Sequence, residues 1–237
     1  MSKLKSRACV ASALVAAAGL ALPLSAAAAN LSFTGTFSRD DDVQLFTFNT
    51  STESTITLRT WSYAGGINSA GAAIPEGGFD PILTLFDASG AFIAENDDDS
   101  DFGGECGNVA TSVVTGECFD TYFETTVEPG TYTVSIQQYD YFSVGNLSDG
   151  FANREEYADD NGPILRPTGA FFTSLFGCSN GQFCDADGYN RSNAWAFDIL
   201  NVDTAAVVPL PASIWFLATG LAGLGWARKG WRLRQSA

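Results

Sequence analysis

The residues of this 237-residue chain with the clearest chemical potential are acidic. Asp97, Asp99 and Asp101 occupy alternate positions of one run, and Glu105 follows. Alternating carboxylates can converge on one hard cation, and calcium accepts about six to eight oxygen ligands from flexible loops. The run therefore predicts a candidate calcium site. Phe102 stands where an EF-hand loop requires glycine, so a true EF-hand is not expected.

A second acidic turn has the same alternation. Asp185 and Asp187 lie beside Gly188, and Asn190 supplies a further oxygen. For both turns, calcium binding and a simple solvated acidic surface are the two interpretations. Paired carboxylates can also hydrolyse glycosides without histidine, so a carbohydrate-active enzyme using acids of residues 141–184 is a further alternative.

Composition excludes several classes of function. The chain contains no histidine, which removes Ser-His-Asp and Cys-His catalysis and histidine metal ligands. Its formal net charge of -15 argues against nucleic-acid binding, which needs a positive surface to neutralise phosphates. All 27 acids lie between Asp40 and Asp203, and the region between the two terminal basic clusters contains five arginines and no lysine. The ordinary interpretation of this distribution is a solvated anionic surface.

The N-terminus has the order of a secretory signal. Lys3, Lys5 and Arg7 precede an apolar run over residues 8–24, and small residues follow to Ala29. This pattern predicts a signal helix over residues 1–29, with cleavage by signal peptidase after Ala29. The compartment that receives the chain is then oxidising.

The C-terminus carries a second apolar segment. Residues 207–227 contain no charge, and this length is enough to cross a bilayer as a helix. A basic tail over residues 228–237 follows and keeps that end in the cytoplasm. We therefore expect a transmembrane helix over about residues 212–227, with the acidic region on the far side of the inner membrane.

A short motif precedes that helix. It consists of Val208, Pro209, Leu210, Pro211, Ala212 and Ser213, and the basic cluster begins with Arg228 and Lys229. Motif, apolar span and basic tail together resemble the VPLPA variant of the PEP-CTERM sorting signals. The resemblance implies a Gram-negative bacterium, processing by an exosortase-type membrane protease, a transient membrane span, and a connection with exopolysaccharide. The prolines cannot continue a helix, so they leave an extended segment for a protease.

The region between the two signals is typical of an antiparallel β-sandwich. In residues 130–137, Tyr132, Val134 and Ile136 share one face and threonine and serine share the other, which is the period of a strand. Further strands are expected over residues 31–37, 43–48, 55–61, 81–86 and 195–199, and the run over 81–86 has the composition of a strand buried on both faces. We therefore predict one all-β domain over residues 30–207, while residues 63–78 and 141–184 are long loops that are either functional or mobile.

Several of these runs resemble a known module. Residues 80–90 and 92–99 form a D-P-x-L-x-L-x-D-x-x-G hairpin with an Asn-Asp-Asp turn, residues 129–134 a P-G-x-Y-x-V strand, and residues 41–48 an opening strand. They are similar to bacterial pre-peptidase C-terminal (PPC) domains and to PEP-CTERM-associated exported proteins without an assigned activity. The resemblance implies a jelly-roll-like sandwich.

Four cysteines remain after signal removal. An even number in an exported chain predicts disulfides, and short spacings favour the pairs Cys106–Cys118 and Cys178–Cys184. A four-thiolate zinc site is the alternative, but the usual C-x2-C spacing is missing.

These observations lead to one expectation about function. The chain is expected to be a non-enzymatic protein of the cell surface or extracellular matrix, associated with exopolysaccharide or biofilm. A calcium-dependent carbohydrate-binding module and a secreted carbohydrate-active enzyme are the alternatives.

Overall fold

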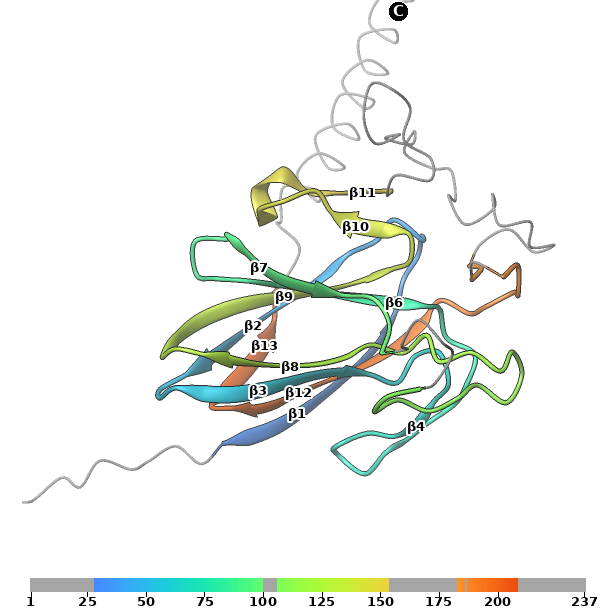
Figure 1. The fold of residues 1–237 in the computed structure, drawn as a ribbon, viewed down its shortest axis with the longest axis horizontal. Coiled ribbons are helices and arrows are strands. Elements are labelled where there is room, and N and C mark those ends of the chain that lie inside the picture. Colours follow the sequence, from blue (N-terminus) through green and yellow to red (C-terminus); the bar gives the residue numbers. More distant parts are fainter. Residues whose placement is uncertain (1–27, 100–105, 154–182, 186, 209–237) are drawn as a thin grey trace, which may run out of the picture.

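The computed structural model describes residues 28–99, 106–153, 183–185 and 187–208. Within these ranges the regular structure is all β, apart from one 3-10 turn at Leu147–Asp149. The main strands form two antiparallel sheets that face each other (Figure 1), which confirms the predicted β-sandwich.

The first sheet has four strands in the order β1-β12-β3-β8. Its members are β1 (Ala29–Thr36), β12 (Ala194–Val202), β3 (Ser54–Thr60) and β8 (Tyr122–Val127). The first strand thus pairs with one that lies near the end of the described chain, and Phe33 lies opposite Phe197 in that pairing.

The second sheet has five strands in the order β13-β2-β9-β6-β7. Its members are β13 (Thr204–Val207), β2 (Gln44–Thr50), β9 (Gly130–Gln138), β6 (Pro81–Phe86) and β7 (Phe92–Asn96). Most successive long strands alternate between the two sheets. The sandwich therefore forms only when segments distant in sequence come together.

Apolar side chains at alternate positions fill the space between the sheets. Val134 and Ile136 of β9 are fully buried and pack with Phe46 of β2 and Phe197 of β12. The ring of Phe46 lies 5.3 Å from that of Phe197, so aromatic contacts cross between the sheets. The predicted alternation of apolar and polar residues thus matches the alternation of core-facing and outward-facing side chains.

The outer face of the five-stranded sheet is also covered. A hairpin of β10 (Tyr141–Ser143) and β11 (Phe151–Asn153) lies over it in Figure 1. Every residue of β6 is buried as a result, as its continuous apolar run predicts.

The segment 63–78 lies on the outer face of the four-stranded sheet. It contains the small hairpin of β4 (Gly66–Ile67) and β5 (Ala73–Ile74). The carboxylate of Asp198, in β12, accepts hydrogen bonds from Ser32 at 2.5 Å, from the Trp61 indole at 2.8 Å and from the Ser69 amide at 2.9 Å. One buried acid therefore joins this segment to the sheet.

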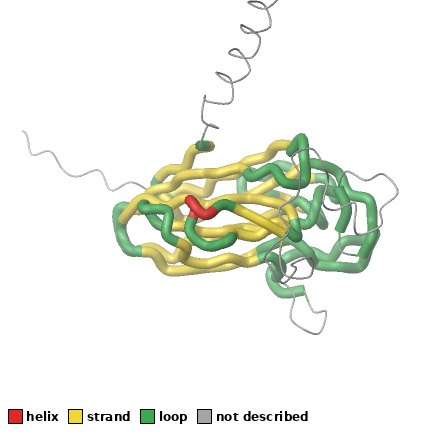
Figure 2. Tube along the Cα trace, turned by 90° about the horizontal axis from the view of Figure 1, so that it is seen from above, coloured by secondary structure: helices red, strands yellow, loops and turns green. Residues whose placement is uncertain are grey.

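Figure 2 shows that the long loops gather at one end of the sandwich.

The predicted disulfide Cys106–Cys118 is present, with a Cα–Cα distance of 5.6 Å. Cys184 is also disulfide-bonded, and its expected partner Cys178 lies outside the described residues. The signal helix over 1–29 and the transmembrane helix over 212–227 fall almost wholly outside them as well. In the described ranges, no helix has the length and apolar character that a membrane crossing requires.

Candidate functional site

A groove of about 610 Å³ opens on the outer face of the four-stranded sheet, beside its edge strand. Thr34 and Thr36 of β1 and Ala194 and Ala196 of β12 form its floor, because they alternate with the residues that point into the core. Short side chains at these four positions leave the backbone of the sheet accessible. The floor thus offers the two threonine hydroxyl groups among methyl groups of threonine and alanine.

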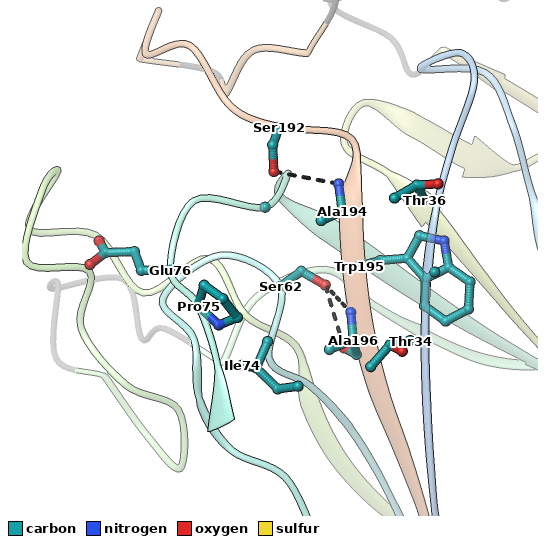
Figure 3. Close-up of a pocket in the computed structure, with 12 residues that line it drawn as sticks. Thr34, Thr36, Ser62, Ile74, Pro75, Glu76, Ser192, Ala194, Trp195 and Ala196 are labelled. Carbon is teal, nitrogen blue, oxygen red and sulfur yellow. Dashed lines mark hydrogen bonds between the residues drawn. The ribbon is translucent and has the colours of Figure 1, made fainter. Parts of the chain in front are cut away.

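The segment 63–78 and the residue before it supply the opposite wall. Ile74 and Pro75 point toward the floor, and Ser62 lies between them and β12 (Figure 3). The Ser62 hydroxyl accepts a hydrogen bond from the Ala196 amide at 3.1 Å, which fixes it against the strand. A groove of this size and mixed lining is within the range of small-ligand sites, about 300–1,000 Å³.

One lining residue of the groove is acidic. The carboxylate of Glu76 points away from the floor (Figure 3), accepts a hydrogen bond from the Val114 amide at 3.2 Å and also contacts the Ser112 hydroxyl. The lining therefore does not supply the pair of carboxylates that glycoside hydrolysis needs. Residues 154–182, within the loop where such a pair was expected, lie outside the described part of the chain.

Carboxyl groups gather at one end of the sandwich, which we call the acidic end: Asp80, Asp97, Asp98, Asp120 and Asp185. Asp80 directly precedes β6, and Asp97 and Asp98 directly follow β7, the antiparallel neighbour of β6. The strand pairing thus brings these three acids to the same edge. The hydroxyl of Thr121 bridges them further, because it lies 2.6 Å from the Pro81 carbonyl and 2.5 Å from that of Asp97.

The acidic end holds carboxyl groups whose ionisation is disfavoured. Burial, followed by the negative charges of Asp98, Asp97, Asp185 and Asp120, raises the pKa of Asp80 well above its usual value. Burial, and then Asp97 and Asp120, raises the pKa of Asp98 to about 8. Each ionised carboxylate in this group therefore raises the free energy needed to ionise the next one.

Two of these acids have structural partners. The Asp120 carboxylate accepts hydrogen bonds from the Thr60 hydroxyl at 2.8 Å and from the amides of Tyr63 at 3.1 Å and Ala64 at 2.8 Å. The Asp185 carboxylate accepts one from the Tyr63 hydroxyl at 2.6 Å. These two carboxylates hold the start of the 63–78 segment in place.

The predicted calcium ligands are only partly brought together. Asp97 belongs to the acidic end and Asp99 follows it closely in the chain, whereas Asp101, like Glu105, lies outside the described residues. The Asp99 carboxylate contacts the Asn108 amide, and its carbonyl accepts from Gly107 at 2.8 Å.

The second predicted turn is divided in the same way. Asp185 is buried at the acidic end, and its carboxylate accepts a hydrogen bond from the Tyr189 amide at 2.8 Å, whereas Asp187 is exposed. In the described ranges, no three His, Cys, Asp or Glu side chains form a group that could hold a metal ion.

Asp80 is a site residue that was not predicted from the sequence. The Asp-Pro pair at residues 80–81 is part of the hairpin motif, which assigns no role to Asp80. The sequence does contain a signal for Asp80. An acid directly before a strand that is buried on both faces lies at the buried end of that strand, where a charge is costly unless it has a partner.

The predicted sorting motif begins at Val208, the last described residue. The Val208 amide donates a hydrogen bond to the Leu45 carbonyl at 2.9 Å, so the sheet extends to the first residue of the motif. The rest of the motif, Pro209 to Ser213, and the basic residues Arg228 and Lys229 lie outside the described ranges.

Comparison with known proteins gives no assignment. No protein-family model matches the chain. No curated protein matches it either.

Proposed function

We propose that this chain is an exported, non-enzymatic protein of the cell surface or extracellular matrix of a Gram-negative bacterium. In this proposal signal peptidase removes residues 1–29 and an exosortase-type protease processes the VPLPA segment, with only a transient stay in the inner membrane. The released sandwich then associates with exopolysaccharide or biofilm. No nucleic-acid partner is expected, because the domain is strongly acidic.

The observation that carries this proposal is the position of the sandwich between the two signals. β1 covers Ala29–Thr36, so cleavage after Ala29 removes only its first residue, and β13 ends at Val207, immediately before the VPLPA motif. Because Val208 is still bonded to β2, cleavage beyond it leaves both sheets complete. This arrangement suits a folded domain that is released by proteolysis at its C-terminal side.

The order of the strands supports the finer proposal of a jelly-roll-like, PPC-like sandwich. Eight strands form two sets of four, β1-β12-β3-β8 and β2-β9-β6-β7, and β13 adds a short edge strand. A jelly roll likewise arranges eight strands in two sheets with Greek-key connections.

Intact mass of the protein recovered from its native cells tests the export proposal. We expect a species that begins near Asn30 and lacks the basic tail. A Pro209→Ala/Pro211→Ala double variant should accumulate with its tail in the inner membrane, whereas Ser236→Ala should be processed as the wild type is. Retention of the full-length wild-type chain in the inner membrane would contradict the proposal.

Glycan binding in the groove is the second candidate function. The observation that favours it is the groove floor, where Thr34 and Thr36 present hydroxyl groups beside the apolar Ile74 and Pro75. Sugars offer the same combination of hydroxyl groups and apolar ring faces. The groove therefore has the chemistry to hold one or two saccharide units.

Calorimetry with oligosaccharides released from the exopolysaccharide of the same bacterium tests this candidate. Thr34→Trp fills the groove and should abolish binding. Thr55→Trp is the matched control, because Thr55 is exposed on β3, bonded to Thr126 and outside the groove lining. Equal binding by both variants would exclude the groove as the site.

A further inference from the structure

We propose that the acidic end binds a divalent cation, calcium, between the carboxylates of Asp80 and Asp98 and the side-chain carbonyl oxygens of Asn96 and Gln138. Asp98 lies in the 97–101 run that the sequence singled out, but the site uses none of the ligands predicted for either acidic turn. It is also independent of the export proposal, so either can fail without the other.

The strand pairing brings these four residues together. Leu83 of β6 lies opposite Asn96 of β7, and Pro81 lies opposite Gln138 of β9. If the β6–β7 pairing continues by two residues, Asp98 lies opposite Pro81. Pro81 then has Gln138 on one side and Asp98 on the other, and both side chains lie on the same face of the sheet. Asp80 is the residue before Pro81. The four side chains therefore start from adjacent positions at one end of three neighbouring strands.

Oxygen atoms without partners coincide with this place. Asp80 Oδ1, Asn96 Oδ1, Asp98 Oδ1 and Gln138 Oε1 are all buried and accept no hydrogen bond. Asp80 is 3% exposed and Gln138 is 0% exposed. An isolated buried acceptor is costly, and native proteins nearly always satisfy such groups. Four of them at one end of three strands indicate that a positively charged ligand completes the structure.

The direction of Gln138 strengthens this argument. Its Nε2 donates a hydrogen bond to the Cys184 carbonyl at 2.9 Å, next to Asp185 of the acidic end. The amide group is therefore fixed by its nitrogen among the acids, and its oxygen is left as an acceptor there. A bound cation can be coordinated both by this amide oxygen and by the neighbouring carboxylate oxygens.

No side-chain cation of the described residues serves this role. Arg39 forms an ion pair with Asp41 at 2.6 Å, and Arg59 stacks on Trp61 with 3.6 Å between its guanidinium and the ring. Arg191 donates to the Gly78 carbonyl at 2.8 Å and to that of Tyr63 at 2.5 Å. The charge at Asp80 and Asp98 is therefore not balanced by an arginine in this part of the chain.

The ligand chemistry selects calcium. The four atoms are all oxygens, which excludes the softer metals that prefer sulfur or nitrogen. Two carboxylates balance the charge of a divalent ion, and calcium completes its shell readily with neutral carbonyls and water. This composition also agrees with the finding that no three acidic side chains of the described residues form a metal group. Magnesium demands a stricter octahedral geometry, which four groups from three strands do not readily supply.

Calcium titration of the full-length chain in detergent tests the proposal. Calorimetry should show one calcium per chain, and the midpoint of thermal unfolding should rise in calcium relative to EGTA, because a ligand of the folded state stabilises it. Asp98→Asn should weaken calcium binding more than about tenfold. It should also melt at a higher temperature than the wild type in EGTA near neutral pH, because its amide is neutral without a proton, whereas the buried Asp98 carboxyl must either take up a proton or stay charged among other carboxylates.

Two controls separate this site from general charge effects. Glu53→Gln removes one exposed acid in the turn between β2 and β3, and should leave calcium binding unchanged. Gln138→Leu keeps every charge but removes a neutral ligand, and should also weaken binding. No calcium-dependent change in the wild type at millimolar calcium would overturn the proposal. So would wild-type affinity in the Asp98→Asn variant.

Discussion

Gly35 of β1 lies directly opposite Trp195 of β12, and a Cβ atom at Gly35 would stand 2.3 Å from Cζ2 of the indole. No side chain other than hydrogen fits there, because carbon atoms do not approach so closely. The absence of a side chain therefore lets the indole lie across the edge strand and close the core beside Phe37 and Phe46.

Gly35→Ala should lower the free energy of unfolding by about 1–3 kcal/mol, because the methyl group must displace the indole from a packed core. Chemical denaturation with tryptophan fluorescence measures the change. Gly130→Ala is the matched control in another strand, since its Cβ would meet Tyr132 at an ordinary 3.5 Å. Equal losses in the two variants would contradict this account of Gly35.

Asp198→Ala should destabilise the protein by about 2–4 kcal/mol. It leaves the Ser32 hydroxyl, the Trp61 indole N–H and the Ser69 amide without their acceptor in a buried place. Limited proteolysis should then cut the 63–78 segment before the rest of the sandwich. Asp203→Ala, at the half-buried turn residue before β13, removes an acid far from the 63–78 segment and should leave the cleavage pattern as it is in the wild type.

The Cys106–Cys118 disulfide should contribute about 3 kcal/mol on the chain-entropy model, because it closes a loop of 12 residues. A Cys106→Ser/Cys118→Ser variant, compared with the oxidised wild type by urea denaturation, measures this contribution. Reducing the wild type should give a loss at least as large, since Cys184 is disulfide-bonded too. A variant as stable as the wild type would show that the bridge does not constrain the unfolded chain.

The calcium-free protein should lose stability as the pH rises. Burial and neighbouring carboxylates raise the pKa of Asp98 to about 8, whereas an aspartate of the unfolded chain titrates near about 3.9. Between these values the folded protein holds a proton that the unfolded chain has released. This stabilisation is complete below about pH 4 and is lost as the pH rises through about 8.

Unfolding in EGTA at several pH values measures that loss. Asp98→Asn should show a flatter dependence than the wild type, because its amide does not titrate. Parallel curves for the two proteins would contradict the pKa of Asp98.

The strands β1, β2, β3, β6, β9 and β12 could be predicted because each leaves a local trace in the sequence, whereas β8, β10, β11 and β13 lie where no strand was expected. Tyr132, Val134 and Ile136 alternate with small polar residues, and the run over 81–86 is apolar except for Thr84, so their period and burial follow from composition. The pairing of β1 with β12 has no such trace. It depends on residues about 165 positions apart and appears only when the two sheets are assembled.

The candidate site shows the same limit. Alternating acids at residues 97–101 suggested a cation loop, because nearby ligands are visible in sequence. Asp80 and Gln138 come from different strands and reach the same end of the sheet only through the β6–β9 pairing, in which Pro81 lies opposite Gln138. Their burial, and the lack of partners for their oxygens, are properties of the fold and not of either segment alone.

The position of β1 has a consequence for how the chain matures. Its hydrogen-bonded neighbour in the four-stranded sheet is β12, and Ala29 lies opposite Val202. When a polypeptide crosses a translocation channel from its N-terminus, β1 therefore emerges long before its partner β12. High contact order of this kind slows folding. In the proposed export, the sandwich would therefore stay open until its final strands arrive on the same side of the membrane.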